Sequence, residues 1–592
     1  MAVRFRRLLV ALTLVLVAPG CADRGSALIG DASDSATADD DADTVTPDAA
    51  VTDGTTPDDT ADTSLPDSGP LDDTVTLDSA PLEDTTATDS DAADSDAADS
   101  DAADVTPPDT SADVVHDTVS NGTVTVGDPG RILLLGVVVT PDVSFDGEVL
   151  VVGSHIACVA PGSTCAATAE AQGATIIDTG GGVIAPGFID AHNHILFDIF
   201  DDSDWLPSKT YTNHSQWPTE DRYKAMLDVK QCLEDASQGK PTWCPTSYDG
   251  AGSLKCELDK WGELKGMIAG TTSIVGLPGT SSGCFGSLSR SIDTAQNDLD
   301  AGDHIQTSAL FPPSASAGDG VCGNFDTLKT NAYLIHCGEG TDAKALAEFA
   351  KLGTLTTVDD CLYAAQTVIT HGTAFTTTEF AVMADADMKL TWSPASNVAL
   401  YGATANIPAA LDAGVLVTLA PDWSMGGSQN ILDEMRFASA WDDGHFGDRL
   451  SARDLVFMTT QNAAIALALD DRIGTLAPGF LADIVVVAGS GDPYAVLVAA
   501  RPVDVMLTMI GGRVLYGDAV IQLAAAPAPP CEAIDVCGAP KFLCVAESSS
   551  ADKLNQTYAQ IKTTLEAALV DLDGVATNGY EFAPLAPLVH CD

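Results

Sequence analysis

The chain is poor in basic residues, with 27 Lys and Arg against 85 Asp and Glu among its 592 residues. The formal net charge of -58 argues against nucleic acids and anionic lipid surfaces as partners, because both are polyanions that such a chain repels. Aromatic residues are also scarce, at 6% of the chain. The low overall content hides one local excess of aromatic residues, over residues 197–260.

Long apolar runs are missing where a membrane anchor would be expected. Residues 8–17 supply only about ten apolar positions between an Arg cluster and Pro19, whereas a membrane-spanning helix needs about 20. The Ala-Pro-Gly-Cys run that ends at Cys21 resembles a bacterial lipobox, which implies cleavage before Cys21 and a diacylglycerol on its sulfur. We therefore predict that residues 1–21 are a lipoprotein-type signal peptide and that the chain is exported and lipid-anchored in the bacterial cell envelope, at the outer membrane or cell surface. The alternatives are a retained anchor, or an ordinary signal peptide followed by an incidental cysteine.

The segment after Cys21 lacks the apolar residues that a folded core needs. Residues 22–120 contain 28 acidic residues and one basic residue, Arg24, in a background of Thr, Ser, Ala and Pro. Such a stretch does not bury enough apolar surface to offset chain entropy, and the repeat Asp-Ser-Asp-Ala-Ala over residues 89–104 adds low complexity. We expect a disordered, self-repelling tether over residues 22–128. A calcium-binding Asp array is the alternative, but the Gly-punctuated spacing of calcium loops is absent.

No two CxxC pairs with the spacing of a zinc knuckle occur among the 14 cysteines. An exported chain is expected to form disulfides, and removing Cys21 leaves thirteen cysteines, so at least one further thiol should be unpaired. Three groups of neighbouring cysteines favour local bridges of undetermined pairing: Cys158 and Cys165; Cys232, Cys244 and Cys256; and Cys531, Cys537, Cys544 and Cys591.

Short apolar runs separated by turn residues predict the fold class. Runs at 132–139 and 148–152, and later at 482–487, 503–510 and 512–516, predict a small β-sandwich domain split between residues 129–182 and 474–525. Helical stretches such as 343–352 and 430–440 alternate with apolar strands between these flanks. This alternation favours an α/β fold with a (β/α)8 TIM-like barrel over residues 183–473. Residues 526–592, with one amphipathic helix at 551–569, are expected to form a structural cap.

The most informative run is VIAPGFIDAHNH at residues 183–194, in which His192 and His194 stand two positions apart. On a strand this spacing places both imidazoles on one face, so that both can reach one cation at the mouth of a barrel. Neutral imidazole nitrogen is a preferred zinc ligand. A chance HxH has a probability of roughly 0.2 in a chain with ten histidines, so the surrounding residues must decide.

The run PGFIDAHNH resembles the first-strand motif of the amidohydrolase superfamily of metal-dependent (β/α)8 hydrolases. Later segments resemble that family in the same order: LKGMIAGTTSI at 264–274, YLIHCGE at 333–339, VITHG at 368–372, SPASN within 392–402, VLVTLAPDWS at 415–424 and IGTLAPGFLADIVVV at 473–487. The resemblance covers residues 132–523, about two-thirds of the chain. Six ordered matches make coincidence a poor explanation.

The resemblance implies a set of site residues. The implied metal ligands are His192, His194, His336 and Asp422. This set would leave one divalent ion, with zinc expected and iron as the alternative, net positive and able to lower the pKa of a water molecule so that hydroxide attacks the substrate. The resemblance further makes Asp422 the general base, His371 the group that polarises the bond under attack, and Glu339 the shuttle that carries a proton to the leaving nitrogen.

Each of these residues also has a structural alternative. His336 and His371 could be satisfied core histidines, and Asp422 could cap a helix. Glu339 stands in a Gly-rich turn. Strand alternation points Cys337 away from the barrel axis, which favours a core or disulfide role over that of a thiolate ligand.

A second metal is not indicated, because no lysine lies between Lys265 and Lys329 to bridge two ions. In the family, a single-metal site with the HxxE element goes with deaminases and hydrolases of cyclic amides or amidines, which resemble imidazolonepropionase and the chlorohydrolase and cytosine deaminase relatives. We therefore expect a hydrolase of non-peptide C–N bonds acting on a small molecule, a planar nitrogen-containing ring. The alternatives are a dipeptidase- or lactonase-type amidohydrolase and a catalytically inactive, metal-containing binding protein at the cell envelope.

An aromatic excess follows the first motif directly. Residues 197–260 contain Trp205, Tyr211, His214, Trp217, Tyr223, Trp243 and Tyr248. These rings predict either a lid that stacks on a planar substrate or the small core of a long loop. Trp423, next to Asp422, is a second candidate wall of a substrate pocket.

Overall fold

The computed structural model describes residues 122–236, 239–276, 288–293, 299, 305–308, 311–525, 530–546, 555–575 and 579–591. The predicted signal peptide with Cys21, and the tether up to residue 121, lie outside these residues and stay predictions. In the described part of the chain, no helix combines the length and the apolar character needed to cross a membrane. Strand β1 (Thr123–Thr125) already pairs with β5, so folded structure begins before residue 129, inside the range assigned to the tether.

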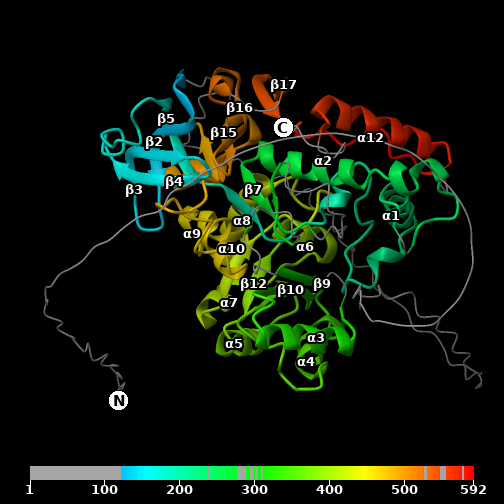
Figure 1. Cartoon of the computed structure of the whole chain (residues 1–592). Coiled ribbons are helices and arrows are strands. Elements are labelled where there is room, and N and C mark those ends of the chain that lie inside the picture. Colours follow the sequence, from blue (N-terminus) through cyan, green and yellow to red (C-terminus); the bar gives the residue numbers. More distant parts are fainter. Residues whose placement is uncertain are drawn as a thin grey trace, which may run out of the picture. The chain divides into compact units, whose positions relative to one another are not determined.

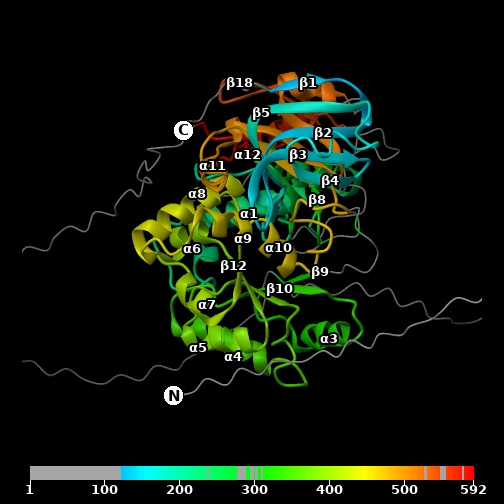
Figure 2. The ribbon, with the colours of Figure 1, turned by 90° about the vertical axis from the view of Figure 1, so that its left-hand side faces the viewer.

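Strands from both flanks of the chain form one ten-stranded sheet in the order β17-β18-β16-β15-β14-β5-β2-β3-β4, with β1 paired to β5 (Figure 2). Its other strands are β2 (Asp128–Val139), β3 (Ser144–Val152), β4 (His155–Pro161), β5 (Ala174–Pro186), β14 (Ile484–Val487), β15 (Val505–Ile510), β16 (Arg513–Asp518), β17 (Cys531–Val536) and β18 (Ala539–Cys544). Strands from both flanks of the chain thus lie side by side in this sheet. The strands share one hydrogen-bonded sheet, however, and not two separate sheets, and β17 and β18 extend it from the region expected to be a cap.

Strand β5 is the element that joins the two flanks. Strand β1 pairs with its first half, β2 pairs parallel with both halves, and its last four residues pair antiparallel with β14, as Ala185 does with Val485. Gly180 and Gly181, between these halves, have φ angles of 67° and 97°. Residues with a side chain rarely adopt this left-handed region, so glycine lets the strand change direction while it stays in one sheet.

Eight shorter strands form two parallel sheets next to the large one. The three-stranded sheet contains β6 (Phe188–Asp190), β7 (Thr271–Ile274) and β8 (Arg290–Ser291), and the five-stranded sheet contains β9 (Ile305–Ser308), β10 (Ala332–Cys337), β11 (Thr367–His371), β12 (Lys389–Trp392) and β13 (Leu416–Leu419). A parallel bridge between Asn193 and Asp422 connects the two sheets at one edge. Parallel sheets confirm the α/β class, whereas no ladder joins β8 to β9 among the residues described, so closure of the barrel is not shown.

Helices follow most of the parallel strands (Figure 1). They are α1 (Asp221–Leu233), α2 (Lys255–Ile268), α3 (Ala315–Asp326), α4 (Ala343–Thr354), α5 (Thr377–Asp385), α6 (Pro394–Tyr401), α7 (Ile407–Ala413), α8 (Ile431–Trp441), α9 (Ala452–Met458), α10 (Gln461–Ala466), α11 (Pro493–Ala499) and α12 (Tyr558–Asp573). The Asp342 side chain starts α4 by accepting the backbone N–H groups of Lys344 and Ala345. The predicted helices at 343–352 and 430–440 are confirmed as α4 and α8. Helix α12 begins later than predicted because Thr557 and Gln560 form a capping box there.

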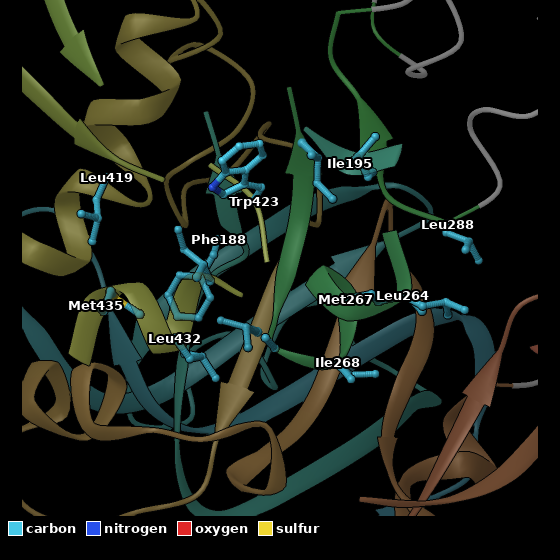
Figure 3. Close-up of a cluster of buried hydrophobic side chains, with 14 of the residues drawn as sticks. Phe188, Ile195, Leu264, Met267, Ile268, Leu288, Leu419, Trp423, Leu432 and Met435 are labelled. Carbon is cyan, nitrogen blue, oxygen red and sulfur yellow. The ribbon is translucent and has the colours of Figure 1, made fainter. Parts of the chain in front are cut away.

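One large apolar cluster contains side chains from both the large sheet and the parallel strands. Figure 3 shows Phe188 of β6 between Leu432 and Met435 of α8 on one side and Met267 of α2 on the other. All four side chains are fully buried. The large sheet and the parallel strands therefore share their packing, which holds the end of β6 in place.

Five disulfides have both cysteines in the described residues: Cys158–Cys165, Cys232–Cys244, Cys322–Cys361, Cys531–Cys544 and Cys537–Cys591. Four of them lie within the cysteine groups expected to form local bridges. Cys337 is free and buried, which confirms the expectation of an unpaired thiol and the core role of this residue. The disulfide alternative for Cys337 is wrong.

The C-terminal strap, residues 579–591, lies across the segment that follows His194. The backbone N–H of Ala586 donates to the carbonyl of Ile199 at 3.2 Å, and the rings of Phe582 and Phe200 pack edge to face with centroids 5.6 Å apart. The Cys537–Cys591 disulfide ties this strap to the β17–β18 hairpin.

Removing the strap's disulfide is expected to destabilise the fold. Cysteines 537 and 591 are 54 positions apart, so the double variant Cys537→Ser/Cys591→Ser should lower the free energy of unfolding by about 3 kcal/mol. Denaturant unfolding measures this change. The Cys158→Ser/Cys165→Ser variant opens a bridge across only 7 positions and should lose less. An unchanged free energy in the first variant would contradict the proposed anchoring of the strap.

Candidate active site

Five side chains from the ends of four parallel strands meet at one place. One ligand atom from each of His192, His336, His371 and Asp422 lies within 4.8 Å of the others, and all four residues are buried. His194 joins them, with its Nε2 3.5 Å from Asp422 Oδ1. His192 and His194 follow β6, His336 and His371 lie at the ends of β10 and β11, and Asp422 follows β13. The carboxyl ends of parallel strands share one edge, which is where α/β folds place their sites.

Two of these residues have an unusual backbone conformation. His371 has a φ of 74° and Asp422 a φ of 72°, in the left-handed region that side chains other than glycine avoid. Each costs on the order of 1 kcal/mol or more and persists only where the surroundings hold it, which is a property of functional sites. Two main-chain hydrogen bonds hold the backbone of Asp422. Its N–H donates to the carbonyl of His192 at 3.1 Å, and its carbonyl accepts the backbone N–H of His194 at 2.7 Å.

Burial keeps the imidazoles uncharged. It lowers the pKa of His192 and of His336 to about 3, and lowers the pKa of His194 and of His371 well below the usual value. Burial also raises the pKa of Asp422, which His194 and His336 counteract. Neutral imidazole nitrogens and one carboxylate are the donor set that divalent transition metals prefer, so these residues fit a metal ion.

Hydrogen bonds distinguish His336 from His371. The Nδ1 of His336 lies 3.2 Å from the carbonyl oxygen of Ser308, which only accepts, so Nδ1 carries the proton and Nε2 keeps its lone pair. The Nδ1 of His371 accepts from Asn397 Nδ2 at 3.0 Å, so the proton of His371 is on Nε2. The Thr404 hydroxyl donates to Asn397 Oδ1 at 3.3 Å and sets this orientation of the amide. His336 therefore presents an acceptor to the cluster, whereas His371 presents a donor.

Glu339 lies beside this cluster on the turn after β10. Its Oε2 is 4.0 Å from His371 Nε2, and its Oε1 accepts the Tyr401 hydroxyl at 2.5 Å. Burial raises the pKa of Glu339 to about 7. Gly338 and Gly340, on either side, have φ angles of 71° and 140°, which lets this short turn point the carboxyl inward.

The aromatic residues of the insertion, residues 197–260, pack mainly against one another. Trp205 and Tyr223 are buried, with ring centroids 5.0 Å apart, and both pack against Trp217. Trp217 contacts Trp423 at a centroid distance of 5.3 Å, and Trp423 contacts the ring of His194 at 5.7 Å. Trp205 and Tyr223 thus form the small core of a long loop, which is the second of the two alternatives for these rings. This core packs, through Trp217, against Trp423 next to the candidate metal ligands.

The structure therefore brings together all six residues that the resemblance implied. Sequence reasoning left Asn397, Tyr401 and Glu348 without a role, although Asn397 lies in the SPASN run and Tyr401 closes the Leu-Tyr-Gly that follows it. Glu348, on α4, accepts the backbone N–H of Gly338 at 2.8 Å and hydrogen-bonds His214 at 2.6 Å. These contacts join segments far apart in the chain, so no local pattern signals them.

Relatives with a similar sequence are deaminases. A 5-methylthioadenosine/S-adenosylhomocysteine deaminase of Moorella thermoacetica is 28% identical over 375 residues, which are 58% of this chain and 84% of the relative. A 5'-deoxyadenosine deaminase of Methanothermobacter thermautotrophicus is 26% identical, over 64% of this chain and 91% of the relative.

Two solved structures align with this chain at low similarity. An adenosine deaminase from Xanthomonas campestris with bound zinc is 18% identical with a TM-score of 0.47, over 65% of this chain and 92% of that one. The guanine deaminase of E. coli is 15% identical with a TM-score of 0.45, over 65% of this chain and 99% of that one.

The fold is α/β, and a buried cluster of imidazoles and one carboxylate lies at the ends of its parallel strands. These two features place the protein in the class of α/β proteins with a candidate metal centre. A sequence model of the amidohydrolase family matches residues 330–515, which include His336, His371 and Asp422. Over these residues the chain resembles the amidohydrolase family, and this similarity, together with the deaminase relatives, supports a hydrolase acting on carbon–nitrogen bonds other than peptide bonds.

Proposed function

We propose that the chain is a single-metal deaminase, or cyclic amide or amidine hydrolase, acting on a planar nitrogen-containing ring. In this proposal the eight parallel strands close into a (β/α)8 barrel, and one divalent ion, with zinc expected, is held by His192, His194, His336 and Asp422. The observation that carries the proposal is the convergence of these neutral imidazoles on the buried Asp422 carboxylate, whose Oδ1 lies 2.9 Å from His192 Nε2.

The residues of the site can divide the chemistry among them. A bound divalent ion supplies positive charge that lowers the pKa of a water molecule. Asp422 accepts a proton from the attacking water as general base. The Nε2–H of His371 donates to the oxygen or nitrogen that gains charge, which is where a preorganised donor has its largest effect. Glu339 delivers a proton to the leaving nitrogen from the same side.

A planar ring as substrate has two supports. The indole of Trp423 lies directly after the general base and beside His194, where it offers an aromatic face to a ring under attack. The similar proteins carry the names of deaminases of adenosine derivatives. We propose an aminated heterocycle as the substrate class on these two grounds.

A substrate panel tests this proposal. The metal-loaded protein should release ammonia from at least one member of a panel of aminated purines, aminated pyrimidines and triazines, or should open a cyclic ureide or amidine. Ammonia release and ultraviolet spectra of the ring measure the reaction. If the metal-loaded protein turns over none of these and hydrolyses a dipeptide or a lactone, the alternative reading replaces this one.

Turnover is expected to fall as the pH rises above about 7, because Glu339 must begin in its protonated form. A carboxylic acid is fully protonated below its pKa, and its protonated fraction falls about tenfold per pH unit above it. The measurement is kcat/KM across the neutral range. Glu339→Gln has no proton to lose there, so its residual activity should lack this alkaline limb; a limb that persists unchanged in the variant would belong to another group.

A further inference from the structure

Tyr401 links the candidate proton shuttle to the insertion. It is the last residue of α6, its side chain is buried, and its hydroxyl donates to Glu339 Oε1 at 2.5 Å. The same hydroxyl oxygen accepts the indole N–H of Trp217 at 2.9 Å. A chain of two hydrogen bonds therefore runs from the insertion, through α6, to the turn after β10.

These hydrogen bonds make the two carboxyl oxygens of Glu339 inequivalent. Because the Tyr401 oxygen accepts from Trp217, its own hydrogen points to Glu339 Oε1. A proton on Oε1 would weaken this bond, because the OH oxygen of a carboxylic acid is a poorer acceptor than its carbonyl oxygen. Oε2 is the other oxygen, and it lies 4.0 Å from His371 Nε2.

We infer that Tyr401 is a positioning residue for Glu339, which by occupying Oε1 places the transferable proton on Oε2, facing the reacting atoms. The inference rests on the shuttle role of Glu339 in the proposed function. Trp217 acts one step further away, because it sets the direction in which the Tyr401 hydroxyl donates. Part of the insertion is thereby assigned to catalysis and not to substrate contact alone.

The backbone around Glu339 is already held by other contacts, so the carboxyl orientation is what remains for Tyr401 to set. Asn213 forms an antiparallel bridge with Gly340, and the N–H of His214 donates to the Glu339 carbonyl at 3.2 Å. Glu348 holds the N–H of Gly338 at 2.8 Å. These bonds fix the main chain on both sides of Glu339 and leave its side-chain torsions free.

A double-mutant cycle tests the inference in the metal-loaded enzyme with a substrate found in the panel. Glu339→Gln should lower kcat by about 10²–10³-fold. Tyr401→Phe should lower kcat by about tenfold with KM changed by less than about twofold, because only the proton transfer is affected. The double variant should be no slower than Glu339→Gln alone, since Tyr401 acts only through Glu339.

Two further variants separate positioning from stability. Tyr363→Phe is the matched control, because the Tyr363 hydroxyl donates to the carbonyl of Phe349 at 2.6 Å and should leave kcat unchanged when removed. Trp217→Phe keeps an aromatic ring but loses the donor to Tyr401, and should lower kcat by about threefold, again with no further loss when combined with Glu339→Gln. Thermal unfolding of each variant checks that it is folded.

The outcomes distinguish failure of the positioning role of Tyr401 from failure of the proposed function. A Tyr401→Phe enzyme with kcat within about twofold of wild type, or losses that multiply in the double variant, would overturn the inference while the proposed function stands. If Glu339→Gln turns over at the wild-type rate, the shuttle role in the proposed function fails, and the inference fails with it.

Discussion

Replacing Asp422 by Asn is expected to lower kcat by at least about 10³-fold and to leave the protein folded. The amide accepts no proton from water and is a weaker metal ligand than a carboxylate, so both proposed roles of Asp422 are lost. Asn is the substitution of choice because it tolerates the left-handed backbone, with φ of 72°, better than Ala does. Asn has nearly the same shape and volume as Asp, so the variant should remain folded.

The measurements for this variant are kcat, metal content and thermal unfolding. Asp443→Asn serves as the control, because Asp443 is an exposed carboxylate of a second acidic group, formed with Asp442 and Asp448. This control should retain wild-type turnover and metal content. An Asp422→Asn enzyme that works at the wild-type rate would remove Asp422 from the chemistry and would leave the proposed function without its general base.

Removing the metal is expected to abolish turnover, with a loss of at least about 10³-fold, and one equivalent of zinc per chain should restore it. A chelator followed by titration with zinc measures both the loss and the stoichiometry. Restoration that requires two equivalents per chain would favour the dipeptidase or lactonase alternative. A protein that binds metal but shows no dependence of turnover on it would contradict the proposed mechanism.

Two histidine variants make the metal experiment sharper. His336 presents the Nε2 lone pair to the cluster, so His336→Ala should lower the metal content of the purified protein as well as its turnover. His371 presents an N–H, so His371→Ala should keep one metal per chain and lose turnover alone. Loss of metal in His371→Ala would show that His371 is a metal ligand. The role of hydrogen-bond donor to the substrate would then pass to another residue of the cluster.

Much of the candidate site could be predicted because its residues stand in short local patterns. The spacing of His192 and His194 follows the two-residue period of a strand, and the helix over 343–352 begins where Asp342 caps it. The motifs resembling the amidohydrolase superfamily supplied the order in which His336, His371 and Asp422 appear. The structure places all of these side chains in one cluster, and their roles stay proposals for the experiments above.

Other features could not be predicted, because they depend on which segments become neighbours. The β17–β18 hairpin joins the large sheet through pairing of β18 with β16, and nothing in the tail's own sequence indicates that partner. The two aromatic alternatives for the insertion have the same composition, and only the packing of Trp205 on Tyr223 distinguishes them. The Asn397 amide that sets the protonated nitrogen of His371 comes from helix α6, whereas His371 ends strand β11.

The amino-acid sequence by itself determined the local elements of this protein: strand and helix periods, caps, glycine turns, the acidic composition of residues 22–120 and the residue types that can bind a metal. Tertiary structure alone decided which of the two Glu339 oxygens is occupied, which nitrogen of His371 carries its proton, and how the insertion reaches the site through Tyr401. The physical reason is range. Periodicity and capping act over about four residues, whereas hydrogen-bond direction and burial, which set protonation, depend on atoms brought together from distant parts of the chain.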